Sequence, residues 1–84
     1  MVRYAVYLHF ELLEVVPKRG PQQQKILRFI QSLAENPFVE GDFADQDGTF
    51  RTRQIKIVGN YAITYWADHP AKTVMVVDIC LADQ

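Results

Sequence analysis

Cysteine is almost absent, because Cys80 is the only one among 84 residues. One thiol cannot form a disulfide within the chain. His9 and His69 lie in different segments and have no partner at the spacing that zinc ligands need. The sequence therefore predicts no disulfide and no metal, and it fits a protein of the reducing cytoplasm.

Long hydrophobic runs and glycine-rich loops are also missing. No stretch approaches the roughly 18 to 20 apolar residues of a membrane span. The first sixteen residues are apolar, but Arg3, His9, Glu11 and Glu14 interrupt them in a way that no secretory signal does. The four glycines are scattered, which excludes a phosphate-binding loop. We expect a soluble, unprocessed, cytoplasmic protein with no cofactor and no membrane partner.

Neither sign of charge is in excess, since nine Lys and Arg balance ten Asp and Glu and the net charge is -1. The surface as a whole is therefore not basic, although a local cluster can still create a positive potential. The acidic run at Asp45 is no calcium loop, because Phe43 and Gln54 stand where ligands are required. Ser32, on a polar helix face, and Cys80, in an apolar strand, lack the surroundings of a nucleophile.

The composition is that of one globular domain covering residues 1–84, with 49% hydrophobic and 23% charged residues. Alternating apolar residues predict a first strand at 2–8. Spacing by three predicts a short helix at 9–16, although the same run could extend the strand. Pro21 suits the first turn of a second helix that ends before Asn36-Pro37. Its apolar stripe consists of Ile26, Phe29, Ile30 and Leu33.

The second half of the chain begins with a segment, residues 35–48, that holds five carboxylates, two glycines and no cation. It is typical of a solvated loop, and we expect Phe38 and Phe43 to anchor it on the core. Gly59-Asn60 suits a two-residue hairpin turn. Strands are predicted at 49–58, 61–67 and 72–81. The fold class is therefore α+β: a strand, two helices, then a three-stranded antiparallel meander, with the helices packed on one face of the sheet.

The best candidate site is a basic cluster at the start of the meander. In a strand, Arg51 and Arg53 share a face with two isoleucines at 55 and 57, and Lys56 lies on the opposite face. Isoleucines usually face a core, so either a bulge follows Arg53 or the arginines occupy the open end of a covered face. In the second case they form a positively charged groove near Lys18 and Arg19, suited to a polyanion or an acidic partner segment. The alternative is a solvated strand end.

Three rings and one carboxylate in the meander also allow two interpretations. Tyr61, Tyr65 and Trp66 could stack on nucleic-acid bases, but their alternation is also that of a packed face. Asp78 is surrounded by apolar residues, so it needs a partner if it is buried. We expect Arg53 or Lys56 across the sheet to form a structural ion pair with it.

Taken in this order, the elements resemble the RelE/ParE superfamily of toxins from bacterial type II toxin-antitoxin modules. The resemblance runs from about Arg3 to Asp83. The residues that carry it are Leu33-Ala34-Glu35-Asn36-Pro37, Gly41-Asp42, the basic strand from Arg51 to Lys56, and the run Gly59-Asn60-Tyr61-Ala62-Ile63-Thr64-Tyr65. That last run is similar to the family signature of glycine, tyrosine, arginine, an aliphatic residue, any residue and tyrosine.

The resemblance implies a toxin that acts on translation or on DNA gyrase and is neutralised by a wrapping antitoxin. Members of the nuclease branch cleave messenger RNA in the ribosomal A site. By resemblance Lys56 and Arg53 are the catalytic candidates. The nucleic-acid or anion contacts expected from the resemblance and the predicted groove are Arg51, Arg53, Lys56, Lys18 and Arg19.

Two departures from the family pattern weaken the catalytic interpretation. Ala62 stands where the signature usually has arginine, and residues 81–84 lack the basic residues and tyrosine of the nuclease tail. Loss of one such cation costs about a hundred- to a thousandfold in rate, by analogy with oxyanion-hole deletions. A toxin that inhibits by binding is therefore preferred. The alternatives are an active ribosome-dependent endoribonuclease and a non-toxic interaction module that kept the fold.

Overall fold

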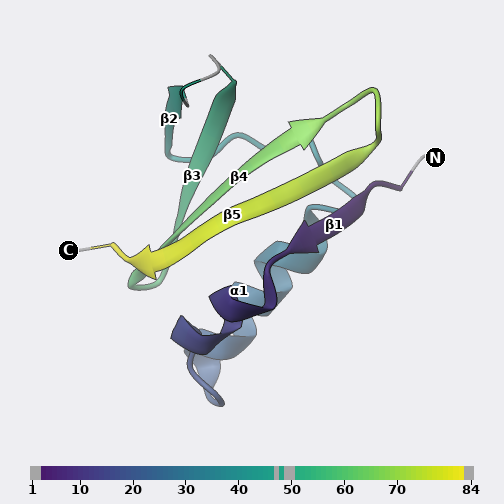
Figure 1. Ribbon diagram of the computed structural model, residues 1–84. Helices are drawn as coiled ribbons and strands as arrows, with labels where there is room; N and C mark the ends of the chain where they lie inside the picture. The colour runs from purple at the N-terminus through teal and green to yellow at the C-terminus, as the bar shows by residue number, and fades with distance from the viewer. Residues whose placement is uncertain (1–2, 47, 49–50, 83–84) are drawn as a thin grey trace.

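A five-stranded mixed sheet with two helices makes up the computed structural model, which describes residues 3–46, 48 and 51–82 (Figure 1). The elements in chain order are β1 (Ala5–Leu8), the 3₁₀ helix η1 (Phe10–Val15), α1 (Pro21–Ser32), β2 (Phe43–Gln46), β3 (Thr52–Val58), β4 (Tyr61–Asp68) and β5 (Thr73–Leu81). The strand order is β1-β5-β4-β3-β2, with β1 parallel to β5 and every other pair antiparallel. The predicted α+β class is confirmed.

The two helices lie where the spacing of apolar residues places them. α1 begins with Pro21 at a position that needs no N–H donor, directly after Gly20, whose φ of 98° favours glycine. Two turns of its apolar stripe, at Ile26 and Ile30, are buried. η1 has only six residues and is bounded by a capping His9 and the extended Val16. No helix in the part of the chain that the structure describes is both long and apolar enough to cross a membrane.

The prediction of an uninterrupted loop at 35–48 is wrong, because β2 forms within it at the edge of the sheet. The four residues of β2 are all exposed and show no apolar alternation. They become a strand by pairing with β3, which offers a free edge. The antiparallel part therefore has four strands rather than the predicted three. Parts of two predicted strands, residue 2 and residues 49–50, lie outside the described residues.

One hydrophobic core joins α1 to one face of the sheet. Its buried members are Val16, Ile26, Ile30, Leu33, Ile63, Tyr65, Val74, Val76 and Ile79. A bulge in β5 makes this possible: Thr64 pairs with Asp78, and Tyr65 pairs with Val76, which leaves Val77 as an extra residue. The bulge lets Val76 and Ile79 point to the same core although they are three residues apart.

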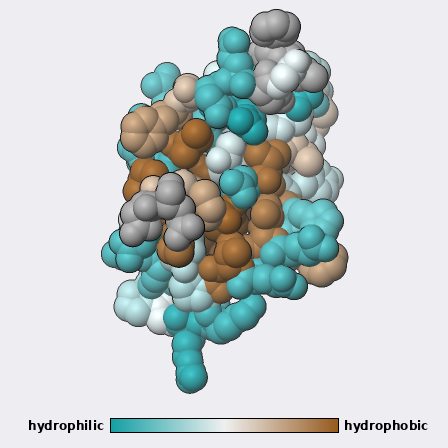
Figure 2. Space-filling view, turned by 60° about the vertical axis from the view of Figure 1, so that its left-hand side comes forward, coloured by the Kyte–Doolittle hydropathy of each residue, from teal (hydrophilic) through white to brown (hydrophobic). Residues whose placement is uncertain are grey.

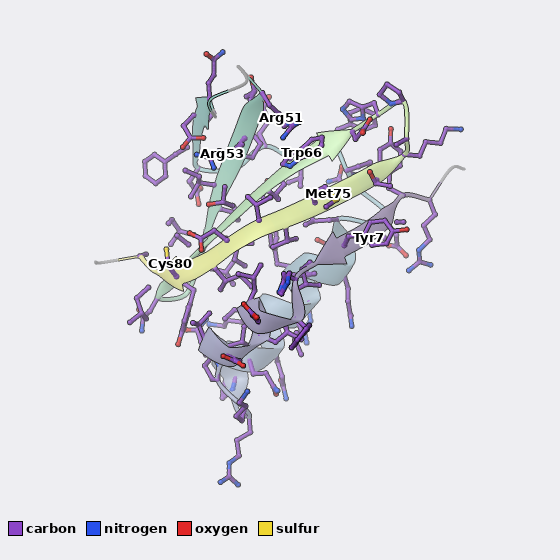
Figure 3. All side chains as sticks on the ribbon, in the orientation of Figure 1. Tyr7, Arg51, Arg53, Trp66, Met75 and Cys80 are labelled. Carbon is purple, nitrogen blue, oxygen red and sulfur yellow. The ribbon has the colours of Figure 1, made fainter. Side chains whose placement is uncertain are left out.

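The sheet face that points away from this core is called the outer face. Cross-strand partners share a face, so the register assigns its members. It comprises Ala5, Tyr7, Phe43, Asp45, Arg53, Ile55, Ile57, Ala62, Thr64, Trp66, Asp68, Thr73, Met75, Asp78 and Cys80, together with the bulged Val77 and with Arg51 just before β3. Figure 3 shows Tyr7, Met75, Trp66 and Arg51 following one another across the sheet.

Candidate functional site

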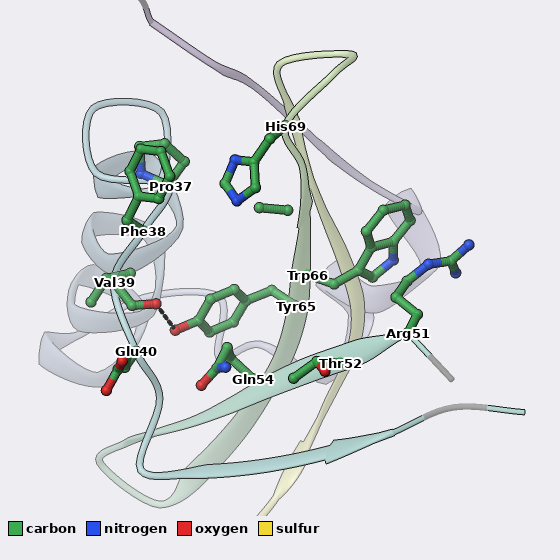
Figure 4. Close-up of a pocket in the computed structure, with 11 residues that line it drawn as sticks. Pro37, Phe38, Val39, Glu40, Arg51, Thr52, Gln54, Tyr65, Trp66 and His69 are labelled. Carbon is green, nitrogen blue, oxygen red and sulfur yellow. Dashed lines mark hydrogen bonds between the residues drawn. The ribbon is translucent and has the colours of Figure 1, made fainter. Parts of the chain in front are cut away.

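Arg51 and Trp66 form the margin of the outer face at the start of β3. The guanidinium carbon of Arg51 lies 3.9 Å from the centre of the Trp66 ring. An exposed cation–π contact of this kind contributes about 0.5 to 1 kcal/mol. Figure 4 shows both side chains on the opposite side of β4 from Tyr65. The ring therefore holds the exposed Arg51 side chain over the outer face.

Arg53 is bound by a carboxylate of the neighbouring strand. Its Nε and Nη2 atoms each donate to Asp45, with both distances 2.9 Å. The two residues are direct cross-strand partners, so the bidentate geometry follows from the register. Because both side chains are partly exposed, the pair contributes no more than about 1 kcal/mol to stability. An incoming anion would have to share the Arg53 guanidinium with Asp45 or displace it.

The predicted catalytic pair leaves β3 on opposite faces. Lys56 is the cross-strand partner of the buried Ile63, so it lies on the side of the sheet that bears the core. Its Nζ is 3.6 Å from Asp42, whose other oxygen accepts the Ile57 N–H at 2.8 Å. Arg53 lies on the outer face. In this conformation the two cations do not converge on one phosphate, and their catalytic role stays a prediction.

Lys18 and Arg19 lie far from the arginines of the outer face. Both are exposed just before α1, and Gln22 in the first turn donates to the Val58 carbonyl at 3.1 Å. This contact places the start of α1 beside the turn between β3 and β4. Arg51 is at the other end of β3, about 20 Å away at a rise of roughly 3.3 Å per residue. Because of this separation, the predicted groove that joins Lys18 and Arg19 to the cations of β3 does not form.

The expectation that Asp78 is a buried partner of Arg53 or Lys56 is wrong. The bulge at Val77 turns Asp78 to the outer face, where it is exposed. The two cations pair instead with Asp45 and Asp42, carboxylates of the acidic segment. The nearby Cys80 thiol has a raised pKa, first through desolvation and then through the charge of Asp78. Cys80 is therefore a poorer nucleophile than a free thiol.

Of the three aromatic rings in residues 61–66, one is available on the outer face. Tyr65 is 1% exposed and belongs to the core, and Tyr61 packs against that core. The packing interpretation is confirmed for these two rings. Trp66 instead lies on the outer face under Arg51. A stacking role for this stretch therefore rests on Trp66 alone.

A cavity of about 400 Å³ separates the segment 37–40 from β3 and β4 (Figure 4). The Tyr65 hydroxyl closes its inner end by donating to the Val39 carbonyl at 3.0 Å. At its outer end Phe38 stacks on His69 with ring centres 4.6 Å apart. The Nδ1 atom of His69 is 2.9 Å from the Tyr4 hydroxyl. Segments far apart in sequence meet here, and sequence spacing carries no signal for this contact.

The expected anchoring of the acidic segment by two phenylalanines is wrong. Phe38 and Phe43 are 69% and 61% exposed. Polar contacts hold the segment instead: Gly41 N–H donates to the Gln54 side chain at 2.9 Å, and Asp42 accepts from Ile57. The Tyr65 to Val39 bond is the third link. The segment is therefore attached through hydrogen bonds to β3 and β4 and through Val39, which packs against the core, rather than through Phe38 and Phe43.

Replacing Tyr65 by phenylalanine tests the link to Val39. Desolvation, followed by the charges of Asp42 and Glu40, raises the pKa of Tyr65 to about 12. The unfolded phenol ionises near pH 10, so the stability due to the protonated phenol is complete below that pH and is lost towards pH 12. We expect the free energy of unfolding of the wild type to fall more steeply over this range than that of Tyr65→Phe. Urea unfolding at several pH values measures the difference, and parallel curves would contradict the assignment.

Comparison with known proteins reveals a fold likeness and no sequence relative. No family model and no curated protein matches the sequence. A chain of the archaeal RelE–RelB complex from Pyrococcus horikoshii OT3 is similar with a TM-score of 0.73 at 16% identity, over 95% of this chain and 96% of that one. A chain of the toxin-antitoxin complex RelBE2 from Mycobacterium tuberculosis is similar with a TM-score of 0.66 at 17% identity, over 95% and 99%. The chain has a RelE-like fold.

Proposed function

We propose that this chain is the toxin of a type II toxin-antitoxin module and that an antitoxin protein neutralises it. The observation that supports the proposal most is the likeness to the Pyrococcus horikoshii complex, which extends over nearly the full length of both chains. A second toxin-antitoxin complex is similar over an equal share of this chain. Two complexes from distant organisms agree on the same class of partner.

The chemistry of the outer face favours inhibition by binding over RNA cleavage. Its middle is apolar, since Ile57 and Cys80 flank Ala62. Ala62 is the position where the RelE/ParE signature usually has arginine. Phosphate cleavage needs cations or other donors fixed around the charge that develops in the transition state. A binding surface needs only complementary shape and charge. We propose that the toxin inhibits translation or DNA gyrase by contact through the margin that contains Arg51 and Arg53.

An active ribosome-dependent endoribonuclease is the second candidate. It is favoured by the presence of Lys56 and Arg53 on the strand where the family has basic residues. Because these side chains lie on opposite faces of β3, the nuclease requires that one of them moves to a shared phosphate when RNA binds. Asp42 and Asp45 would then have to release their cations.

Inducible expression in a bacterial host separates these functions. We expect growth arrest with intact transcripts, and restored growth on co-expression of a neighbouring reading frame if one encodes a protein that binds this chain. Arrest with transcripts cleaved at ribosomes would support the nuclease. Normal growth at a verified level of folded protein would contradict toxicity and support the non-toxic interaction module. A variant outside the candidate site, such as Lys25→Gln on the exposed side of α1, serves as the control for expression level.

A further inference from the structure

The edge of β3 that faces β2 carries two donor sets, and each holds a carboxylate of the same chain. At the first, the Arg53 guanidinium donates from Nε and Nη2 to Asp45, with both distances 2.9 Å. At the second, Asp42 accepts the Ile57 N–H at 2.8 Å and lies 3.6 Å from the Lys56 Nζ. A guanidinium that donates two bonds, and an ammonium beside a backbone N–H, are groups that bind anions strongly. The acidic segment therefore fills two anion-binding sites of β3.

The distance between these sites determines what kind of ligand could fill both. Ile57 comes four residues after Arg53 on β3, which is about 13 Å at a rise of roughly 3.3 Å per residue. One small anion cannot bridge that distance, whereas an extended chain with several negative charges can. Here the bridging chain is residues 42–46, where β2 runs antiparallel to β3 and sets Asp45 opposite Arg53. An extended peptide with two carboxylates three residues apart therefore fits the edge of β3.

The residue that follows Asp42 adds an apolar contact to this pattern. Phe43 is the cross-strand partner of Ile55 on the outer face, although it stays 61% exposed. Figure 2 shows a band of hydrophobic side chains bordered by hydrophilic ones on one side of the molecule. Apolar surface bordered by polar groups is typical of an interaction site. A segment that combines carboxylates with an apolar side chain matches both parts of this border.

The acidic segment holds β3 weakly enough for another peptide to compete with it. β2 has only four residues, all of them exposed, and it lies at the edge of the sheet. The side chains of Asp42 and Asp45 are 43% and 42% exposed, so a competing carboxylate can reach both sites from solvent. Ion pairs with this exposure contribute little to stability, and segments with few buried apolar contacts open locally at low free energy.

From these contacts we infer that the edge of β3 is a docking site for an acidic, extended segment of a partner protein, and that residues 42–46 occupy this site until the partner replaces them. The partner segment pairs with the backbone of β3, as in β-strand addition, and its carboxylates take the places of Asp42 and Asp45. Residues 42–46 are then a built-in competitor. Their tether to the same chain gives them a high local concentration, which sets how tightly a partner must bind.

The backbone of β3 favours a peptide over a nucleic acid as the partner. A strand edge presents both N–H donors and C=O acceptors, and another strand satisfies both. Phosphates accept hydrogen bonds but do not donate them, so a phosphate chain would leave the carbonyls of this edge without partners. The groups that occupy the two sites in this structure are also carboxylates.

Arg53 belongs both to this docking site and to the margin proposed for target contact. The inference goes beyond the proposed function, because it assigns a partner chemistry to the edge of β3 whether or not the chain is toxic. Peptide binding is measured on purified protein. Failure to bind a peptide would leave the toxin proposal intact, and normal growth on expression would leave the docking site intact.

A fluorescent peptide with the sequence of residues 40–46 serves as the probe, and fluorescence anisotropy measures its binding. Asp42→Asn combined with Asp45→Asn removes the charges of the built-in competitor and keeps the cations of β3. We expect this variant to bind the peptide roughly tenfold or more tightly than the wild type, because the competitor no longer opposes it. Glu11→Gln combined with Glu14→Gln on η1 changes the net charge equally and should leave peptide binding unchanged. If the first variant is folded by circular dichroism and binds no more tightly than the wild type, the inference is wrong.

A reversible lock tests the replacement in a single protein. Gln46 and Thr52 are exposed and are direct cross-strand partners, so cysteines at both positions lie within reach of a disulfide. Cys80→Ser removes the native thiol. With Gln46→Cys and Thr52→Cys, we expect the oxidised protein to bind the peptide roughly tenfold or more weakly than the reduced protein, because β2 can no longer leave β3. Equal affinity in the two redox states would show that the peptide does not take the place of β2.

A single-stranded RNA oligomer tests the class of partner. We expect the variant with asparagine at both Asp42 and Asp45 to gain more affinity for the peptide than for the RNA. An equal or larger gain for the RNA would mean that the edge of β3 takes a nucleic acid, and the assignment to a protein partner would be overturned. A peptide with both aspartates replaced by asparagine should bind that variant roughly tenfold or more weakly than the acidic peptide does. Equal binding of the two peptides would show that carboxylates are not what the site recognises.

Discussion

Reversal of charge at both Arg51 and Arg53 should abolish growth arrest while the protein stays folded. The two side chains provide the cationic margin of the outer face, and Trp66 and Asp45 hold them in place. Two glutamates there would repel an anionic target that the arginines attract, and like charges across an interface cost several kcal/mol. We therefore expect a loss of roughly a hundredfold or more in target inhibition. Colony counts after induction, with soluble protein measured in parallel, record the effect.

The pair with Asp45 dictates the controls for this experiment. Arg53→Glu alone sets two carboxylates opposite each other across β2 and β3, which weakens the edge of the sheet. Combining Arg53→Glu with Asp45→Arg keeps an ion pair in the same register. A second control, Lys25→Glu combined with Arg28→Glu on the exposed side of α1, changes the net charge equally at a distant surface. Toxicity that survives reversal at both arginines would exclude this margin from target contact.

Local sequence patterns predicted α1 and the turn between β3 and β4, because the residues that determine each of them are close together in the sequence. The apolar stripe of α1 marks one side of the helix at regular spacing, and its buried members Ile26 and Ile30 are the ones that the pattern selects. Gly59-Asn60 marks the turn between β3 and β4, where Gly59 has a φ of 61°. In each case the information lies within a few neighbouring residues, which is why sequence alone sufficed.

β2 and the bulge in β5 could not be predicted because both depend on pairing between distant segments. Phe43–Gln46 has no strand pattern of its own and becomes a strand against β3. Val77 is bulged because Tyr65 and Thr64 fix the registers on either side of it. The wrong expectation for Asp78 follows from the second of these features, since one extra residue moves a side chain to the other face of a sheet.

The candidate site was predicted in part. Alternation correctly places Arg51 and Arg53 on one face of β3 and Lys56 on the other. The proposed bulge after Arg53 is wrong, because β2 pairs with β3 in regular register there. The isoleucines lie beside the arginines because the outer face itself is apolar. The carboxylate partners were missed, since their contacts depend on how the acidic segment folds onto β3.

Replacement of Gly41 by alanine should cause the largest loss of stability among the glycine positions that lack a positive φ. A Cβ atom at Gly41 would lie 2.5 Å from the Ile55 carbonyl oxygen and 2.8 Å from the Ile55 nitrogen. These are backbone atoms of β3, which is paired with β2 on one side and β4 on the other, so they cannot move without disturbing the sheet. Clashes of this kind typically cost about 1 to 3 kcal/mol.

The same replacement should also loosen the acidic segment, because the Gly41 N–H bonds to Gln54 and the next residue, Asp42, binds both Lys56 and Ile57. In a chain of this size each kcal/mol lowers the melting temperature by roughly 4 to 8 °C. Gly48→Ala is the matched control, since a Cβ there meets nothing within 4 Å, and it should change stability by less than about 0.5 kcal/mol. If thermal unfolding of Gly41→Ala coincides with that of Gly48→Ala, the close approach between the segment and β3 does not exist in solution. Lys56 would then be free to leave Asp42, which would revive its role as a catalytic cation.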